Sequence, residues 1–300
     1  MSRLPGDSRL GLLPKVIRLR AIAPWPPPMR MVVFLAGVVV LWFPVALPFY
    51  WLSAQGVLPG GDLIPTALLY CFFLGLLPRW ERRVHRLTKP WQAIGLSGGQ
   101  LVPLCQGLGV GLASIAVLLV IQLALGWAEI LPAERNWAAL ILAGGLTAMA
   151  VGWAEELLFR GWLLHELEQG GSKAGALIGT SVIFALAHFI KPVEVILDTW
   201  PQFLGLLLLG LSLGWARRTP TLHQGRVLKP SLGLPVGLHG GLVWGYYFLS
   251  VGDLSQPTGV VPDWVTGIDG NPLAGMVGIG LLSGLAVWGY RLSHRRSSAV

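Results

Sequence analysis

Apolar segments about as long as a bilayer is thick recur along this chain of 300 residues. A helix needs about 20 mostly apolar residues to cross the hydrocarbon core of a membrane. Hydrophobic residues make up 54% of the sequence and charged residues only 12%, against about 25% charged in soluble domains. The sequence therefore predicts an all-α fold, a polytopic membrane helix bundle of about eight transmembrane helices. The eight segments cover residues 31–53, 61–78, 105–126, 137–160, 174–190, 201–216, 231–250 and 272–290.

These segments also set the expected domain organisation. Residues 1–30 form a basic, proline-containing lead, residues 31–291 a single transmembrane bundle, and residues 292–300 a short basic tail. The first apolar run is too long for the apolar core of a signal peptide, so we expect it to be retained as the first span.

The charges between the segments predict the orientation of the chain. With the N-terminus inside, 20 of the 22 Lys and Arg residues fall in inner loops or termini, and only Arg135 and Lys191 fall outside. Such a bias of basic residues marks the cytoplasmic side, so both termini are predicted to be cytoplasmic. The outer loops carry eight acids, namely Asp62, Glu129, Glu134, Glu194, Asp198, Asp253, Asp263 and Asp269.

The net charge of +8 therefore reflects membrane topology rather than a nucleic-acid partner. No basic stripe with interleaved aromatic residues forms a face that could read nucleic acid. Residues 79–99 are basic and aromatic, which suits contact with an anionic lipid surface. The expected partners are the lipid bilayer and no nucleic acid, and the sequence assigns no oligomeric state.

The two cysteines, Cys71 and Cys105, lie in or beside apolar segments without C-x-x-C spacing. We interpret them as small apolar residues rather than as a disulfide, zinc or redox site.

Glycines spaced four residues apart indicate where helices pack closely in a membrane. Gly233, Gly237, Gly241 and Gly245 form such a ridge along the seventh segment. The same spacing recurs at Gly210 and Gly214 and at Gly280 and Gly284, where we also expect close packing.

Two adjacent acids, Glu155 and Glu156, lie near the inner end of the fourth segment, with Arg160 one turn later. An acid near the centre of a membrane helix costs about 2.5–3.5 kcal/mol, so an acid at membrane depth is a functional-site hypothesis by default. Glu156 and Arg160 have the i,i+4 spacing of a helical ion pair. Because Glu155 projects about 100° around the helix from Glu156, one acid can be paired while the other faces a cavity.

Two histidines in other apolar segments can meet these acids. Glu155 and His188 lie about equally far from the turn at residues 170–172, so an antiparallel hairpin would bring them level. His239 projects away from the glycine ridge of its own segment, and its imidazole can therefore face a cavity.

This set of groups suits hydrolysis of an amide by activated water. A carboxylate in an apolar cavity can accept a proton from water, an imidazole can hold that water, and a second donor can stabilise the oxyanion. Three alternatives stay open at this point. The acids can form a structural charge cluster, the His and Glu residues can bind zinc although H-E-x-x-H spacing is absent, or the groups can relay protons in a transporter.

The order E-E-x-x-x-R, then F-x-x-x-H with Phe184 and His188, then a later His239, resembles the CPBP intramembrane proteases. That family includes CAAX prenyl proteases of the Ras-converting type and bacteriocin-processing or immunity proteins, and the resemblance covers residues 143–249. It implies a metal-independent glutamic endopeptidase without a cofactor, acting on a membrane-associated or prenylated protein or peptide. It also implies Glu155 as the general base, His188 as its assistant, His239 in the oxyanion hole, and supporting roles for Glu156, Arg160 and Phe184.

One position departs from the family pattern, in which the last motif continues H-x-x-x-N. Here that position is Val243, which has no hydrogen-bond donor, and Tyr246 lies on a similar face of the helix. A non-proteolytic scaffold or immunity-type binding protein is therefore the alternative function. The sequence around His239 is similar to that of cyanobacterial members, which suggests a bacterial inner or thylakoid membrane.

Overall fold

The structure is a computed structural model that describes residues 19–58, 63–132, 134–268, 270–271 and 274–297. Much of the predicted N-terminal lead, the last residues of the predicted tail, and the acids Asp62 and Asp269 lie outside the described residues. The chain divides into two compact units at Pro90, and each is described by itself. The single bundle predicted over residues 31–291 stays a prediction.

The first unit is a pair of long helices, α1 (Pro27–Ala54) and α2 (Leu63–Arg83), preceded by the short 3-10 helix η1 (Leu19–Ile22). The two helices pack through aromatic rings, with Phe34 of α1 lying 5.8 Å from Phe73 and 5.0 Å from Trp80. The indole of Trp42 donates a hydrogen bond to the carbonyl of Pro65 at 2.7 Å. The short helix α3 (Pro90–Ala93) lies where the two units join along the chain.

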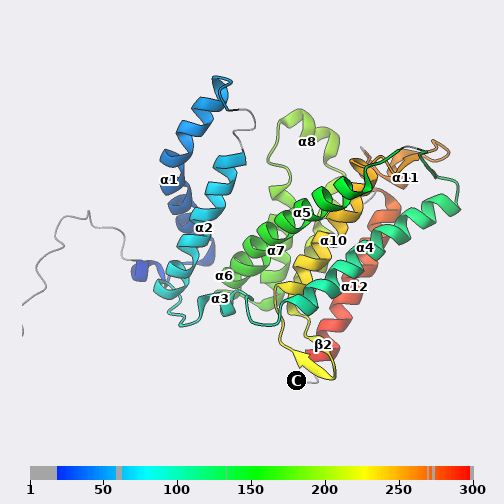
Figure 1. The fold of residues 1–300 in the computed structure, drawn as a ribbon. Coiled ribbons are helices and arrows are strands. Elements are labelled where there is room, and N and C mark those ends of the chain that lie inside the picture. The colour runs from blue at the N-terminus through cyan, green and yellow to red at the C-terminus, as the bar shows by residue number, and fades with distance from the viewer. Residues whose placement is uncertain (1–18, 59–62, 133, 269, 272–273, 298–300) are drawn as a thin grey trace, which may run out of the picture. The chain divides into compact units, whose positions relative to one another are not determined.

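The second unit contains most of the helices (Figure 1). Its longer elements in chain order are α4 (Leu101–Ala124), α5 (Trp137–Glu156), the π-helix η2 (Leu157–Leu163), α6 (Leu164–Glu168), α7 (Lys173–Ala187), α8 (Val193–Thr199), α9 (Gln202–Arg218), α10 (Gly233–Ser250) and α12 (Met276–Ser297). The shorter elements are β1 (Ala128–Ile130), β2 (Thr221–His223), β3 (Arg226–Leu228), β4 (Ser255–Pro257) and α11 (Asp263–Thr266).

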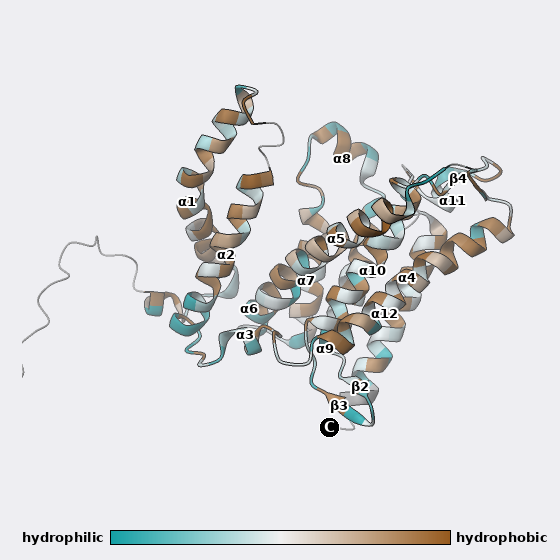
Figure 2. Cartoon of the chain, viewed as in Figure 1, coloured by the Kyte–Doolittle hydropathy of each residue, from teal (hydrophilic) through white to brown (hydrophobic). Residues whose placement is uncertain are grey.

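All eight predicted apolar segments contain a helix, so the all-α membrane fold is confirmed. Among the described residues, five helices are long and apolar enough to cross a membrane, or six if α8 and α9, which meet at 77°, form one broken span. The count of eight spans is not confirmed. One reason is that α7 has only 15 residues, or about 22 Å at the helical rise, which is shorter than a hydrocarbon core of about 30 Å. Figure 2 shows the apolar residues along these helices in brown.

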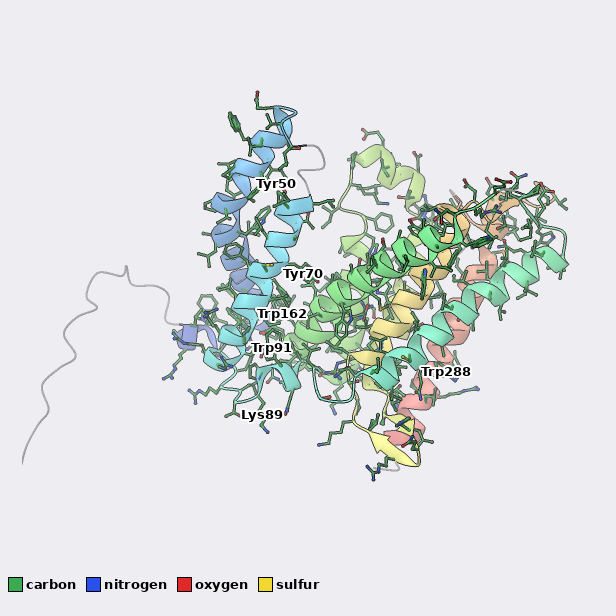
Figure 3. The ribbon with its side chains drawn as sticks, viewed as in Figure 1. Tyr50, Tyr70, Lys89, Trp91, Trp162 and Trp288 are labelled. Atoms are coloured by element: carbon green, nitrogen blue, oxygen red, sulfur yellow. The ribbon has the colours of Figure 1, made fainter. Side chains whose placement is uncertain are left out.

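Large apolar side chains are exposed along the helices, as expected for surfaces in contact with lipid. Trp51 and Trp137 are exposed, and Trp288 of α12, labelled in Figure 3, is 43% exposed. Trp162 is the contrasting case, since it is only 1% exposed inside the second unit. Trp80 of α2 is buried as well, so exposure to lipid does not describe all the tryptophans.

The glycine ridge of α10 packs against α4, as the spacing predicted. A Cβ on Gly237 would overlap the carbonyl oxygen of Leu104, and one on Gly241 would come within 2.5 Å of the carbonyl oxygen of Leu108. Gly111 of α4 meets α10 equally closely. This contact holds the glycine face of α10 and leaves the opposite face for α5, which packs on α10 from another side.

The same spacing was misleading on the last helix. A Cβ on Gly280 or Gly284 of α12 would have no atom within 4 Å, so the predicted close packing there is wrong. Helix α12 packs against α9 instead through Gly289, which lies against Trp215. Glycine spacing reports that a helix could be approached closely, but not which of its faces meets a neighbour.

Two small antiparallel sheets close loops of the second unit. Strand β1 pairs with β4 in the register Ala128↔Pro257, and β2 pairs with β3 in the register Thr221↔Leu228. The β2–β3 turn is formed by Gln224 and Gly225, whose φ angles of 47° and 73° are typical of a two-residue hairpin turn.

Candidate active site

The acid pair and His188 belong to one helical hairpin. Asn136 begins α5 by accepting a hydrogen bond from the Ala139 amide at 3.0 Å. Ser172 begins α7 in the same way, by accepting from the Gly175 amide at 3.0 Å. Asn and Ser are preferred at such positions because their side-chain oxygens satisfy amides that lack a helical acceptor. The hairpin brings Glu155 and His188 level, with Glu155 Oε2 3.9 Å from His188 Nε2.

A π-helix, η2, follows the acids directly and contains Arg160. Such segments are rare, and they occur often at functional sites because they distort the helix locally. Nothing in the residue pattern predicted this segment. The fourth predicted span is consequently one helical element that continues to Glu168.

Glu156 and Arg160 form a buried ion pair. Arg160 Nη1 donates to Glu156 Oε1 at 3.0 Å, and Nη2 donates to the carbonyl of Gly210 on α9 at 3.2 Å. Both side chains are fully excluded from solvent. Buried charges are tolerated when they are paired and hydrogen-bonded, so this pair ties α5 to α9.

His239 connects the two acids. Its Nδ1 lies 2.9 Å from Glu156 Oε1, and its Nε2 lies 3.9 Å from Glu155 Oε2. The imidazole is buried on the side of α10 away from the glycine ridge, as the sequence predicted. Because an ionised carboxylate only accepts hydrogen bonds, Nδ1 carries a proton when Glu156 is ionised.

Glu155 and His188 form the accessible part of the site, with side chains 30% and 34% exposed. His188 Nδ1 lies 2.8 Å from the carbonyl of Phe184. A carbonyl can only accept, so Nδ1 carries the proton, and in the neutral ring Nε2 faces Glu155 with its lone pair.

The second carboxylate oxygen of Glu155 has an unusual position. Oε2 is buried and accepts no hydrogen bond from the described residues. It lies 3.9 Å from the Nε2 atoms of both histidines, which is too far for a direct hydrogen bond. Polar atoms at such a separation are commonly joined by a water molecule between them. Two ligand atoms of a tetrahedral zinc ion, each about 2.0–2.2 Å from the metal, lie roughly 3.4 Å apart. The 3.9 Å separations observed here are longer than that.

Phe184 is the packing centre of the site. Its buried ring lies 4.6 Å from the His188 ring and 6.1 Å from the His239 ring, between centroids. The guanidinium carbon of Arg160 lies 4.3 Å from its centroid, and Phe159 packs edge-on against it. Phe184 of the F-x-x-x-H motif therefore forms an apolar wall beside both His188 and His239.

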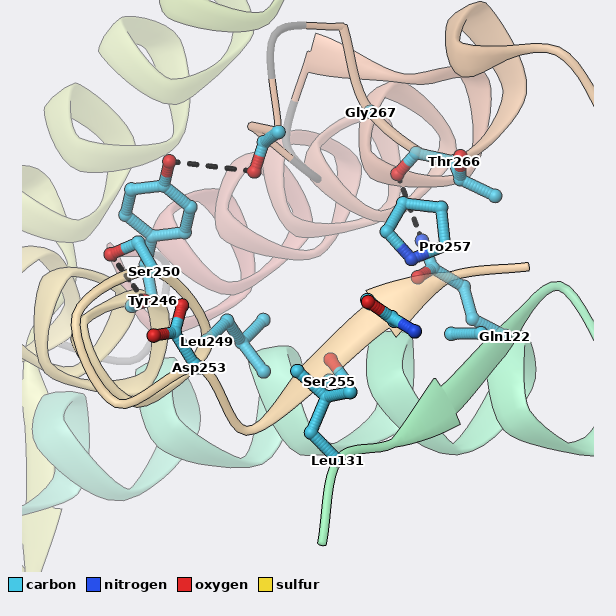
Figure 4. Close-up of a pocket in the computed structure, with 13 residues that line it drawn as sticks. Gln122, Leu131, Tyr246, Leu249, Ser250, Asp253, Ser255, Pro257, Thr266 and Gly267 are labelled. Carbon is cyan, nitrogen blue, oxygen red and sulfur yellow. Dashed lines mark hydrogen bonds between the residues drawn. The ribbon is translucent and has the colours of Figure 1, made fainter. Parts of the chain in front are cut away.

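Tyr246 does not supply the donor that Val243 lacks. Its hydroxyl lies 3.5 Å from the carbonyl of Gly270. It lines a cavity of about 400 Å³ that Gln122, Asp253 and Thr266 also line and that excludes the site residues (Figure 4). The departure from the family pattern at Val243 is thus not compensated by Tyr246.

Residues 135–242 match a family model described as type II CAAX prenyl endopeptidase, Rce1-like. Over these residues the chain is similar to the CPBP/CAAX protease family. The matched residues contain the acid pair, Phe184, His188 and His239, and they end directly before Val243. Comparison with curated proteins and with solved structures gives no significant match.

The structure brings all six predicted site residues together from α5, η2, α7 and α10. Sequence reasoning missed a seventh participant, the Gly210 carbonyl of α9 that binds Arg160. A signal for it was present, because a Cβ on Gly210 would meet Ser181 of α7 at 3.0 Å. The glycine lets α9 approach closely enough for its backbone to reach the site.

Proposed function

We propose that this protein is an intramembrane endopeptidase that hydrolyses a peptide bond of a membrane-associated or prenylated protein or peptide, with water activated by Glu155 and His188. The observation that carries the proposal is the buried Oε2 of Glu155, which lies 3.9 Å from the Nε2 atoms of two histidines. A water between these atoms would contact a base and two imidazoles at once.

In the proposed reaction, Glu155 accepts a proton from this water while the water oxygen attacks the carbonyl carbon of the substrate. His188 orients the water, because its Nε2 lone pair can accept the second water hydrogen. The carbonyl becomes an oxyanion, and its collapse breaks the C–N bond. Glu155 then returns its proton to the leaving nitrogen, so that water is consumed and a carboxylic acid and an amine are released.

His239 is proposed to stabilise the oxyanion. With Nδ1 donating to Glu156, a protonated His239 would offer its Nε2–H to the developing negative charge. Glu156 accepts from Nδ1 and so holds the imidazole with Nε2 toward Glu155, as a buried carboxylate orients other catalytic histidines. Arg160 holds Glu156 in place and prevents the acid from being an unpaired buried charge.

The decisive experiment compares the membrane proteomes of cells that carry the wild type or the Glu155→Gln variant, followed by cleavage of the candidate substrates by purified protein. The substitution keeps the shape of the side chain and removes the base, so we expect a loss of about 10²–10⁴-fold in rate. Glu194→Gln is the matched control, because Glu194 is an exposed acid on α8.

Equal processing by the wild type and Glu155→Gln, with both proteins folded, would overturn the proposal. A thermal melt of each purified variant separates a lost base from a lost fold. Because Glu155 is partly exposed, its conversion to glutamine should leave the melting temperature nearly unchanged.

A second candidate function is supported by Val243. Without a donor at this position the fold could serve as a non-proteolytic scaffold or an immunity-type binding protein. That function requires partner binding to survive Glu155→Gln and no product to form, so a discrete Glu155-dependent cleavage product would exclude it.

A further inference from the structure

A second cavity lies apart from the acid site, at the end of the second unit that carries the β2–β3 hairpin. It has a volume of about 770 Å³, within the range of about 300–1,000 Å³ typical of small-molecule sites. It is formed by the start of α7, the end of α9 and the end of α12, and none of the six site residues lines it. Its charged and aromatic lining residues are Glu168, Lys173, Trp215, Arg217, Arg218 and His294.

The cavity has an excess of positive charge. Arg218 is neutralised locally, because its Nη2 lies 2.6 Å from Glu168 Oε1 and 2.6 Å from the Lys173 carbonyl. Arg217 and the ammonium of Lys173 make no hydrogen bond or ion pair with the described residues, although Glu168 also attracts Arg217 electrostatically. The single carboxylate of Glu168 therefore faces three cations.

Buried donor atoms in the wall point to an anion. Arg217 Nε and Arg218 Nε are shielded from solvent without an acceptor among the residues that the structure describes. Buried polar groups are nearly always satisfied, and guanidinium groups bind phosphate oxygens especially well. The head of Arg217 is fixed against Gly95, where a Cβ would come within 2.6 Å of Nη2.

The other wall of the cavity is aromatic. The ring of Trp215 lies 5.2 Å from that of Tyr290 and 5.4 Å from that of His294. Tyr290 does not line the cavity itself, but it is 49% exposed on α12 next to Trp215. Aromatic residues beside basic residues at the ends of membrane helices are typical of the headgroup level of a bilayer. A ligand with a phosphate and an apolar portion fits both walls, whereas a free phosphate fits only one.

We propose that this cavity binds the phosphate group of an anionic phospholipid, with Lys173 and Arg217 facing the phosphate and Trp215 and Tyr290 lying along the apolar part. The loop charges predict that this end of the bundle faces the cytoplasm, so the lipid would come from the inner leaflet. Basic pockets between membrane helices on that side are suited to anionic headgroups.

The test uses the full-length purified protein in detergent, titrated with short-chain phosphatidylglycerol, short-chain phosphatidylcholine and inorganic phosphate. Binding is measured by the shift in melting temperature and by native mass spectrometry. Lys173→Gln is the main variant, because Lys173 is exposed at the start of α7 and is not needed for packing. Arg217→Gln is the second variant, and Arg226→Gln removes an equal charge from the exposed β2–β3 hairpin as the control.

We expect phosphatidylglycerol to bind more tightly than phosphatidylcholine, and Lys173→Gln and Arg217→Gln each to weaken it about five-fold. Arg226→Gln should bind like the wild type. Equal binding of phosphatidylglycerol by all four proteins would overturn the proposal. Inorganic phosphate binding as tightly as the lipid would show that the ligand is a free anion, and it would overturn the lipid assignment.

Discussion

His239 Nδ1 lies 2.9 Å from Glu156 Oε1, and both side chains are buried. Because of this contact, the neighbouring acids Glu155 and Glu156 have different environments. Glu156 is held through Oε1 by Arg160 and His239 inside the protein, whereas Glu155 is partly exposed and lies 3.9 Å from the two histidines. The two carboxylates therefore respond differently to substitution.

Removing one member of the buried pair should destabilise the fold. We expect Arg160→Ala to lower the free energy of unfolding by about 3–5 kcal/mol, because it leaves Glu156 as an uncompensated buried charge. Thermal unfolding in detergent measures this effect. Glu155→Ala is the matched comparison, and a melting temperature lowered equally in both variants would contradict the distinction between the two acids.

The two histidines should differ in the same way. His188→Ala is expected to lower the cleavage rate by about 10²-fold or more while changing stability by about 1 kcal/mol or less, because His188 is 34% exposed. His239→Ala should reduce both the rate and the melting temperature, since it removes a buried partner of Glu156. Rate and melting curves of each purified variant check this, and an unstable but active His239→Ala protein would argue against an oxyanion role.

The contact of α10 with α4 can be tested with a single methyl group. Gly237→Ala would place Cβ against the Leu104 carbonyl, and overpacking of this kind costs about 1–3 kcal/mol. Gly280→Ala is the control, because its Cβ would meet no atom within 4 Å, and Ala is favoured over Gly in a helix by about 0.5–1 kcal/mol. We expect melting temperatures to fall for the first variant and to stay level or rise for the second.

Metal removal should leave the proposed reaction intact. If Glu155 and His188 activate water without a metal, dialysis against a chelator is expected to leave the cleavage rate unchanged. The measurement is the rate before and after chelation, with metal analysis of the same samples. Loss of activity that added zinc restores would favour the zinc alternative raised by the Glu and His residues.

Much of the fold followed from the sequence because helical geometry is regular. The constant rise per residue predicted that Glu155 and His188 would be level across the hairpin, and the i,i+4 spacing predicted the pair of Glu156 with Arg160. The direction of His239, opposite to the glycine ridge, followed from the same geometry.

The remaining features depend on backbone and long-range contacts that local patterns do not contain. The π-helix over Leu157–Leu163 has no residue signature here, and the Gly210 carbonyl is supplied by a helix distant in sequence. The error at Gly280 and Gly284 has the same origin, since a stripe of small residues does not say which neighbour will meet it.

The π-helix also determines which neighbouring helices are contacted by the side chains before and after it. A π turn holds more residues than an α turn, so the helix on either side of η2 is out of phase with its continuation. Glu155 and Glu156 thereby face α10, while Glu168 beyond the π segment reaches Arg218 on α9. Deleting one residue from η2 would let the helix close as α with its two halves still in the same relative orientation. Closing η2 as α without a deletion would instead turn the two halves about 100° against each other, and either the acids would leave α10 or Glu168 would leave Arg218.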